Sequence, residues 1–130
     1  MPLHRLLHDP RLRTLWRALL LAMMLGVCWL AFTPQPRALP FGNADKLHHV
    51  AAFIVLAACA LLGSGAGRHA AGRAALAMGA FGVFIELVQS QTPGRTGDVP
   101  DLIADAFGIA IGVALVLAAR RRFPEAAPRQ

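Results

Sequence analysis

The sequence is poor in acidic residues and in cysteine. Only seven of its 130 residues are aspartate or glutamate, and it contains two cysteines. Cys28 and Cys59 form no CxxC pair and lie in the middle of long apolar runs, where cysteine behaves as a small apolar residue. A structural disulfide and a thiolate metal site are therefore both disfavoured.

The regular polar positions of a soluble helical bundle are also missing. Hydrophobic residues make up 56% of the chain, above the roughly 45–50% that is usual in soluble domains. A soluble helix shows a polar residue every third or fourth position, whereas the apolar residues here form four blocks, at 18–33, 47–63, 74–91 and 102–119. Each block is near the lower length limit for a membrane-spanning helix. The sequence thus predicts an all-α, membrane-embedded four-helix bundle.

The N-terminus lacks a convincing signal-peptide cleavage site. Arginines precede the first hydrophobic run, as in a secretory signal, but the run ends in LAFTPQPRALP without a small-x-small pattern. We therefore predict an uncleaved first span and three regions: a basic cytoplasmic segment at 1–14, a four-span domain at 15–119 and a basic cytoplasmic tail at 120–130. The expected helices cover about 15–32, 45–63, 74–91 and 98–119, with Asn43 or Asp45 as the cap of the second and Asp98 or Pro100 at the start of the fourth.

Lysine and arginine divide unequally between the two sides of such a bundle. Ten lie on the side of the termini and three on the other. The ten are Arg5, Arg11, Arg13, Arg17, Arg68, Arg73, Arg120, Arg121, Arg122 and Arg129, and the three are Arg37, Lys46 and Arg95. This bias predicts that both termini are cytoplasmic. The same bias explains the net charge of +6, because the basic residues direct insertion into the membrane and contact anionic lipids. The sequence contains no nucleic-acid-binding motif, so we expect no nucleic-acid partner.

Five of the seven acidic residues fall at the predicted outer end of the bundle: Asp45, Glu86, Asp98, Asp101 and Asp105. On a helix, Asp101, Asp105, Gly108 and Gly112 share one stripe, so both acids face a neighbouring helix that the glycines allow to approach closely. Gly79 and Gly82 leave one side of the third span without side chains, so a neighbouring helix can approach closely there too.

Glu86 lies about 7 Å inside the interface at a rise of ~1.5 Å per residue. A carboxylate facing lipid at that depth costs up to a few kcal/mol, so Glu86 must point inward and find a partner. His49 and Arg95 are the best available cations, and Lys46 is a third. Gln89 stands one turn from Glu86 on the same helix.

The arrangement resembles the VanZ-like family of small bacterial membrane proteins. The resemblance rests on two motifs, DKLHHVAAF and ELVQSQTPGRTGDVPDLIADAFGIAIG. The first matches at Asp45, Lys46, His49 and Phe53, and the second at Glu86, Gln89, Arg95, Asp98, Asp101, Gly108 and Gly112. Asp105 departs from the asparagine that is common in the family. The resemblance, over about 15–119, implies a multi-pass protein of the bacterial inner membrane; the founding member is associated with low-level teicoplanin resistance, and most members have no assigned activity.

The leading hypothesis is an outward-facing pocket that binds the head group of an anionic lipid or a lipid-linked cell-envelope precursor. Lys46, His49 and Arg95 would hold phosphate or carboxylate, since arginine suits bidentate contact. Glu86, Asp98 and Asp101 would orient those cations, beside Asp45, Gln89 and Asp105. An effect on teicoplanin susceptibility is the extension of this hypothesis that the resemblance implies.

Two alternatives compete with this hypothesis. In an intramembrane enzyme acting on a lipid, His49 would be the general base, oriented by Glu86 or Asp101; a variant places a divalent cation on His49, Asp98, Asp101 and Asp105. In the second alternative, the role is purely structural: the polar residues neutralise one another and hold the helices of the bundle together. A transporter is least favoured because four short helices leave little room for alternating access, unless the protein is a homo-oligomer. The leading hypothesis includes no cofactor and no bound metal.

Overall fold

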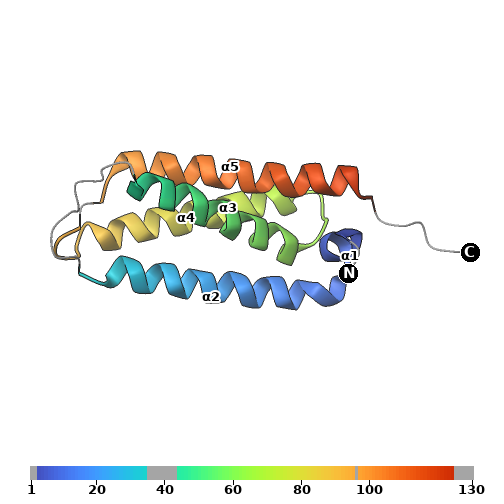
Figure 1. The fold of residues 1–130 in the computed structure, drawn as a ribbon, viewed down its shortest axis with the longest axis horizontal. Helices are drawn as coiled ribbons and strands as arrows, with labels where there is room; N and C mark the ends of the chain where they lie inside the picture. Colours follow the sequence, from blue (N-terminus) through green and yellow to red (C-terminus); the bar gives the residue numbers. More distant parts are fainter. Residues whose placement is uncertain (1–2, 35–43, 96, 125–130) are drawn as a thin grey trace, which may run out of the picture.

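The computed structural model describes residues 3–34, 44–95 and 97–124, without the side chains of residues 3, 44 and 45. These residues form helices and their connections, with no strand among them. The elements are α1 (Leu3–His8), a 3-10 helix η1 (Pro10–Leu12), α2 (Arg13–Phe32), α3 (Ala44–Ser64), α4 (Ala70–Gln89) and α5 (Val99–Arg122). The long helices α2, α3, α4 and α5 lie side by side, with the short α1 at one end (Figure 1). The predicted all-α fold is confirmed.

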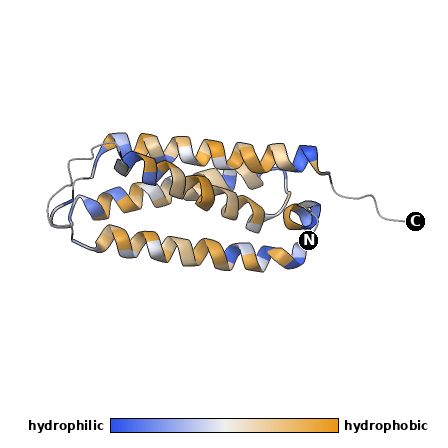
Figure 2. Cartoon of the chain, viewed as in Figure 1, coloured by the Kyte–Doolittle hydropathy of each residue, from blue (hydrophilic) through white to orange (hydrophobic). Residues whose placement is uncertain are grey.

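Four helical segments are long and apolar enough to cross a membrane: Pro10–Phe32, Lys46–Ser64, Ala70–Gln89 and Val99–Arg122. Hydrophobic residues follow one another along the length of the bundle, and hydrophilic residues gather near its ends (Figure 2). Large apolar side chains point outward, including Trp29 at 75% and Leu76 at 76% exposure. In water such a surface would be costly, whereas lipid solvates it.

Helix α3 forms the centre of the bundle, because α2, α4 and α5 all pack against it. Phe53, Leu56 and Leu61 of α3 are among the most completely buried side chains. Helix α2 is different, since most of its residues remain exposed and Ala31 is its buried position. The bundle therefore consists of a tight α3–α5 pair joined by α4, with α2 packed more loosely beside it.

The α3–α5 pair depends on the two glycines of the predicted small-residue stripe. A Cβ atom at Gly108 would lie 2.6 Å from the carbonyl oxygen of Val50, and one at Gly112 would collide with the carbonyl of Ile54. Only glycine permits this approach of the two backbones. The prediction for α4 is half right, since Gly82 faces α5 but Gly79 has no atom within 4 Å of its Cβ position among the described residues.

The helix boundaries differ from the prediction in α2, α4 and α5, and α5 continues to Arg122 instead of ending near residue 119. Helix α4 begins at Ala70 rather than near residue 74, because Ala70 and Ala74 are both buried and alanine is the strongest helix former. Helix α2 begins at Arg13, two residues earlier than expected. The proposed cap Asn43, Arg37 in the proline-rich loop and the last six residues lie outside the described part of the chain, as does the side chain of Asp45.

The N-terminal segment is packed against the end of the bundle where α2 begins and α5 ends, which we call the basic end. A ring nitrogen of His8 is 3.0 Å from the carbonyl oxygen of Phe123, and the indole of Trp16 donates to the carbonyl of Leu6 at 3.2 Å. At this end Arg17 and Arg120 donate to the carbonyls of Gly63 and Gly65. The arginines thereby satisfy one carbonyl group in the last turn of α3 and one just beyond it.

Candidate functional site

The opposite end, where α3 and α5 begin and α4 ends, holds the polar cluster, and we call it the polar end. His49 of α3 and Asp105 of α5 face each other across the tight helix pair, with Nδ1 and Oδ1 2.8 Å apart. Glu86 of α4 completes the group, its Oε1 lying 3.9 Å from the same Nδ1. The Glu86 and Asp105 side chains are 7% and 3% exposed, so two carboxylates share one imidazole in a buried position.

Glu86 also connects the cluster to the start of α5. Its Oε2 accepts a hydrogen bond from the backbone N–H of Asp98 at 2.8 Å. Asp98 is the residue before α5, and its own side chain forms no cap. The N-terminus of α5 therefore presents a backbone donor to a buried carboxylate, which favours the negative charge there.

A second ion pair lies nearer the surface. Lys46 Nζ is 3.6 Å from Asp101 Oδ1, and the two side chains are 41% and 8% exposed. Lys46 stands one turn before His49 on α3, and Asp101 one turn before Asp105 on α5. The helix pair thus carries two matched contacts in successive turns, an exposed one and a buried one.

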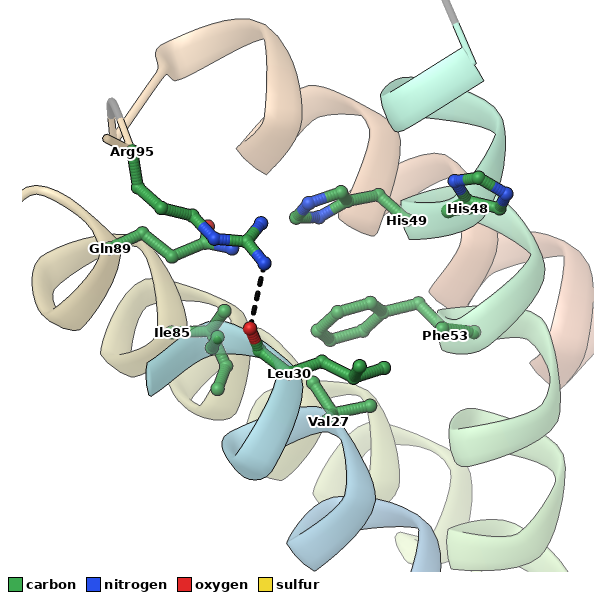
Figure 3. Close-up of a pocket in the computed structure, with 10 residues that line it drawn as sticks. Val27, Leu30, His48, His49, Phe53, Ile85, Gln89 and Arg95 are labelled. Atoms are coloured by element: carbon green, nitrogen blue, oxygen red, sulfur yellow. Dashed lines mark hydrogen bonds between the residues drawn. The ribbon is translucent and has the colours of Figure 1, made fainter. Parts of the chain in front are cut away.

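A cavity of about 390 Å³ lies beside this cluster, between α2, α3, α4 and the loop that follows α4. Its polar lining comes from His48, His49, Gln89 and Arg95, and its apolar lining from Val27, Leu30, Ala31, Ala52, Phe53 and Ile85. Figure 3 shows the Arg95 side chain extending from the loop across the cavity toward α2 and His49. One guanidinium nitrogen, Nη2, donates to the carbonyl oxygen of Leu30 at 2.7 Å. The Nε atom is buried without a hydrogen-bond partner among the described residues.

The sequence model of the VanZ/LLP1 family matches residues 4–120. The chain belongs to this family. No curated protein and no solved structure matches it. Together with the four apolar helices, the family assignment establishes a multi-pass membrane protein. The matched region extends the resemblance into the N-terminal segment, which the structure packs against the bundle.

In this VanZ/LLP1 chain, five of the predicted site residues converge on the helix pair and on α4: Lys46, His49, Glu86, Asp101 and Asp105. Gln89 and Arg95 line the adjoining cavity. Asp98 contributes its backbone N–H, while the residue itself is exposed. Asp45 lies at the start of α3, and its side chain is outside the described residues.

The cation that approaches Glu86 is His49, one of the two best candidates expected from the sequence, whereas the other, Arg95, donates to Leu30 of α2. Two other pairings differ from those expected. The carboxylate that bonds to His49 is Asp105 rather than Glu86 or Asp101. Among the described residues, the group with metal-ligand spacing is His49, Glu86 and Asp105, so neither Asp98 nor Asp101 belongs to it. The reason is the same in each case: α4 brings Glu86 between α3 and α5, and the start of α5 turns Asp98 outward.

Sequence reasoning missed the contribution of α2 and of His48. Val27, Leu30 and Ala31 are ordinary apolar residues of a membrane span, and nothing in their pattern distinguishes them from lipid-facing neighbours. His48 had a signal, since it adjoins His49 at the start of the span. Neighbouring residues of a helix point in different directions. Even so, His48 and His49 both contribute to the lining of this cavity.

Proposed function

We propose that the cavity at the polar end binds the head group of an anionic membrane lipid or of a lipid-linked cell-envelope precursor. The observation that carries the proposal is the guanidinium of Arg95, which extends into the cavity without a carboxylate partner among the described residues. Its Nε–H group is buried without an acceptor among the described residues, and a buried donor that forms no hydrogen bond is costly. An anionic head group supplies the missing acceptor, and arginine forms bidentate contacts with phosphate or carboxylate.

The remaining lining supports an amphiphilic ligand. His48, His49 and Gln89 offer further hydrogen-bonding groups in the cavity lining, whereas Val27 and Ile85 make other parts of it apolar. A volume of about 390 Å³ lies within the range of roughly 300–1,000 Å³ typical of small-molecule sites. Because one wall belongs to the loosely packed α2, we infer that the acyl chains of the ligand lie against this helix, in the membrane.

The proposal predicts that Arg95→Ala protein loses lipid that co-purifies with the parent. Loss of a charge-assisted contact of about 1.5–3 kcal/mol weakens head-group binding by roughly 10–100-fold. The measurement is mass spectrometry of anionic lipids extracted from protein purified in mild detergent. Arg68→Ala is the matched control, because Arg68 is an exposed arginine outside the cavity. Equal lipid content in Arg95→Ala, Arg68→Ala and parent would refute the pocket.

We further propose that the protein lies in the bacterial inner membrane with both termini in the cytoplasm and the polar end outside. Reporter fusions should place residues 1–14, 64–73 and 120–130 inside and the loops around Arg37 and Arg95 outside. The reason is the strong excess of arginine on the terminal side. A cytoplasmic reporter signal from residues 93–98 would contradict this orientation and would move the cavity to the inner leaflet.

If the ligand is a cell-wall precursor, expression of the protein changes teicoplanin susceptibility, and Arg95→Ala removes that change. Family membership motivates this extension, and the lipid measurement above is independent of it.

A second candidate function is supported by the contact between His49 and Asp105. A carboxylate 2.8 Å from Nδ1 selects the tautomer with the proton on that nitrogen and leaves Nε2 as an acceptor. This is the arrangement of a general base oriented by an acid. In an enzyme of this kind, His49 would accept a proton from water or a hydroxyl group during attack on the bound head group.

A further inference from the structure

His49, Glu86 and Asp105 come from three different helices, and each directs a metal-binding atom to the same place. The three ligand atoms all lie within 4.8 Å of one another. Two of the separations are 2.8 Å, from His49 Nδ1 to Asp105 Oδ1, and 3.9 Å, from His49 Nδ1 to Glu86 Oε1. Ligand atoms of a tetrahedral ion with bonds near 2.1 Å are about 3.4 Å apart. The observed separations lie on either side of this value.

The two carboxylates are incompletely satisfied by the protein. Glu86 Oε1 and Asp105 Oδ2 are buried and have no hydrogen-bond partner among the described residues. Their side chains are more than nine-tenths buried, and Glu86 Oε1 points toward the His49 nitrogen. Unsatisfied buried carboxylate oxygens are rare, and each calls for a proton, a water molecule or an ion.

The charge of the cluster calls for a cation as well. Two carboxylates lie close to one imidazole, and no lysine or arginine within the described ranges comes within 4.0 Å of either carboxylate. Lys46 is paired with Asp101 instead. Even a protonated His49 leaves one negative charge uncompensated, whereas a divalent ion with neutral His49 balances the two carboxylates.

We propose that His49, Glu86 and Asp105 bind one divalent ion of the Zn²⁺ or Mn²⁺ type. One imidazole and two carboxylates suit ions of this class. Ca²⁺ is disfavoured because it requires six to eight oxygen ligands. Three protein ligands leave a coordination position open, as in catalytic rather than structural zinc sites. The site shares His49 with the cavity, but it does not depend on the head-group proposal. Because the ion would take the lone pair of Nδ1, this site and a general base with its proton on Nδ1 are alternatives.

Gly82 makes the site testable without changing a ligand. A Cβ atom at this position of α4 would lie 2.7 Å from Asp105 Oδ2, so Gly82→Ala pushes the carboxylate out of place. Gly79→Ala adds the same methyl group to the same helix, where nothing lies within 4 Å among the described residues. The two variants form a matched pair.

The experiment uses full-length protein purified without a histidine tag, stripped with a chelator and reloaded separately with ZnCl₂ or MnCl₂. After removal of excess ion, mass spectrometry measures the metal content. We expect about one ion per parent chain, and affinity reduced at least 10–100-fold in Glu86→Gln, Asp105→Asn and Gly82→Ala. Gly79→Ala should match the parent. Ion binding should also raise the melting temperature of the parent, and this readout does not require the ligand variants to fold.

Two results would overturn the proposal. One is parent protein that retains neither ion and shows no rise in melting temperature with either. The other is Gly82→Ala protein, monodisperse and folded, that binds the ions as tightly as Gly79→Ala. Neither result affects the head-group proposal, which depends on the lipid content of Arg95→Ala.

Discussion

Replacing His49 with leucine is expected to lower the free energy of unfolding by about 3–5 kcal/mol in chelator-treated protein. The substitution leaves the carboxylates of Glu86 and Asp105 buried without the imidazole that lies between them. Removing one partner of a buried pair has an effect of this size because the other charge remains uncompensated. The measurement is equilibrium or thermal unfolding in detergent, followed by circular dichroism.

Lys46→Leu is the control for this prediction. Lys46 makes the neighbouring contact between the same two helices, but its side chain is 41% exposed and it has one carboxylate partner, Asp101 at 8% exposure, so the expected cost is smaller than for His49, which lies beside two buried carboxylates. The double variant His49→Leu/Asp105→Ala should recover part of the loss, since it removes one of the uncompensated carboxylates. If His49→Leu costs no more than Lys46→Leu, the buried cluster does not stabilise the fold, and a purely structural role is excluded.

The structural and binding explanations share His49 but can be tested at different residues. The stabilising contacts join His49, Glu86 and Asp105, whereas Arg95 donates to a backbone carbonyl of α2. Loss of stability in a His49 variant therefore says little about the ligand, and loss of lipid in an Arg95 variant says little about the cluster. If the His49 variant loses stability and the Arg95 variant loses lipid, we infer that the buried cluster supports the cavity.

The burial of the acidic residues could be predicted from the sequence because lipid offers a carboxylate no alternative. Glu86 and Asp105 are 6% and 2% exposed, in agreement with the argument from desolvation cost. The stripe from Asp101 to Gly112 could also be predicted from the sequence, because the relative positions of residues on one helix follow from its geometry alone. The close contacts of Gly108 with α3 confirm that stripe.

The pairing of individual charges could not be predicted in the same way. It depends on the rotation of each helix about its axis and on the path of the loop before α5. The Asp98 backbone N–H occupies one oxygen of Glu86, and no pattern in the sequence indicates that contact. Arg17 and Arg120 are comparable cases, because their charge predicted the inner side of the membrane but not their bonds to carbonyls near the end of α3.

The contribution of helix α2 to the cavity could not be predicted from the sequence. Three of its residues line the cavity, yet the half of α2 near the polar end contains no acidic or basic residue that would indicate a site. The carbonyl oxygen of Leu30 is the group that receives Arg95, and a backbone carbonyl is present at every position. Only the packing of helices distinguishes it from the others.

If the protein catalyses a reaction, the largest effect should follow from His49→Gln, with turnover reduced by about 10²–10⁴-fold. Glutamine retains a donor and an acceptor of similar reach, but it does not accept a proton at neutral pH. Asp105→Asn should also lower turnover, but for a different reason: an amide no longer selects the His49 tautomer with the proton on Nδ1. Lys46→Gln is the control, since Lys46 lies in the neighbouring ion pair and does not contact His49 in the described structure.

The assay compares lipid extracts from cells that express parent, His49→Gln, Asp105→Asn or Lys46→Gln protein, together with head-group binding in detergent. A catalytic histidine requires that the parent convert a lipid species and that this conversion stop in His49→Gln while much of the binding remains. A binding histidine contributes donors and charge, so its replacement reduces affinity and alters no product. If the parent changes no lipid species and His49→Gln weakens binding only modestly, the enzyme hypothesis fails, because a general base without a reaction has no function. The bond between His49 and Asp105 would then serve to hold the imidazole at the edge of the cavity, where it meets the head group together with Arg95.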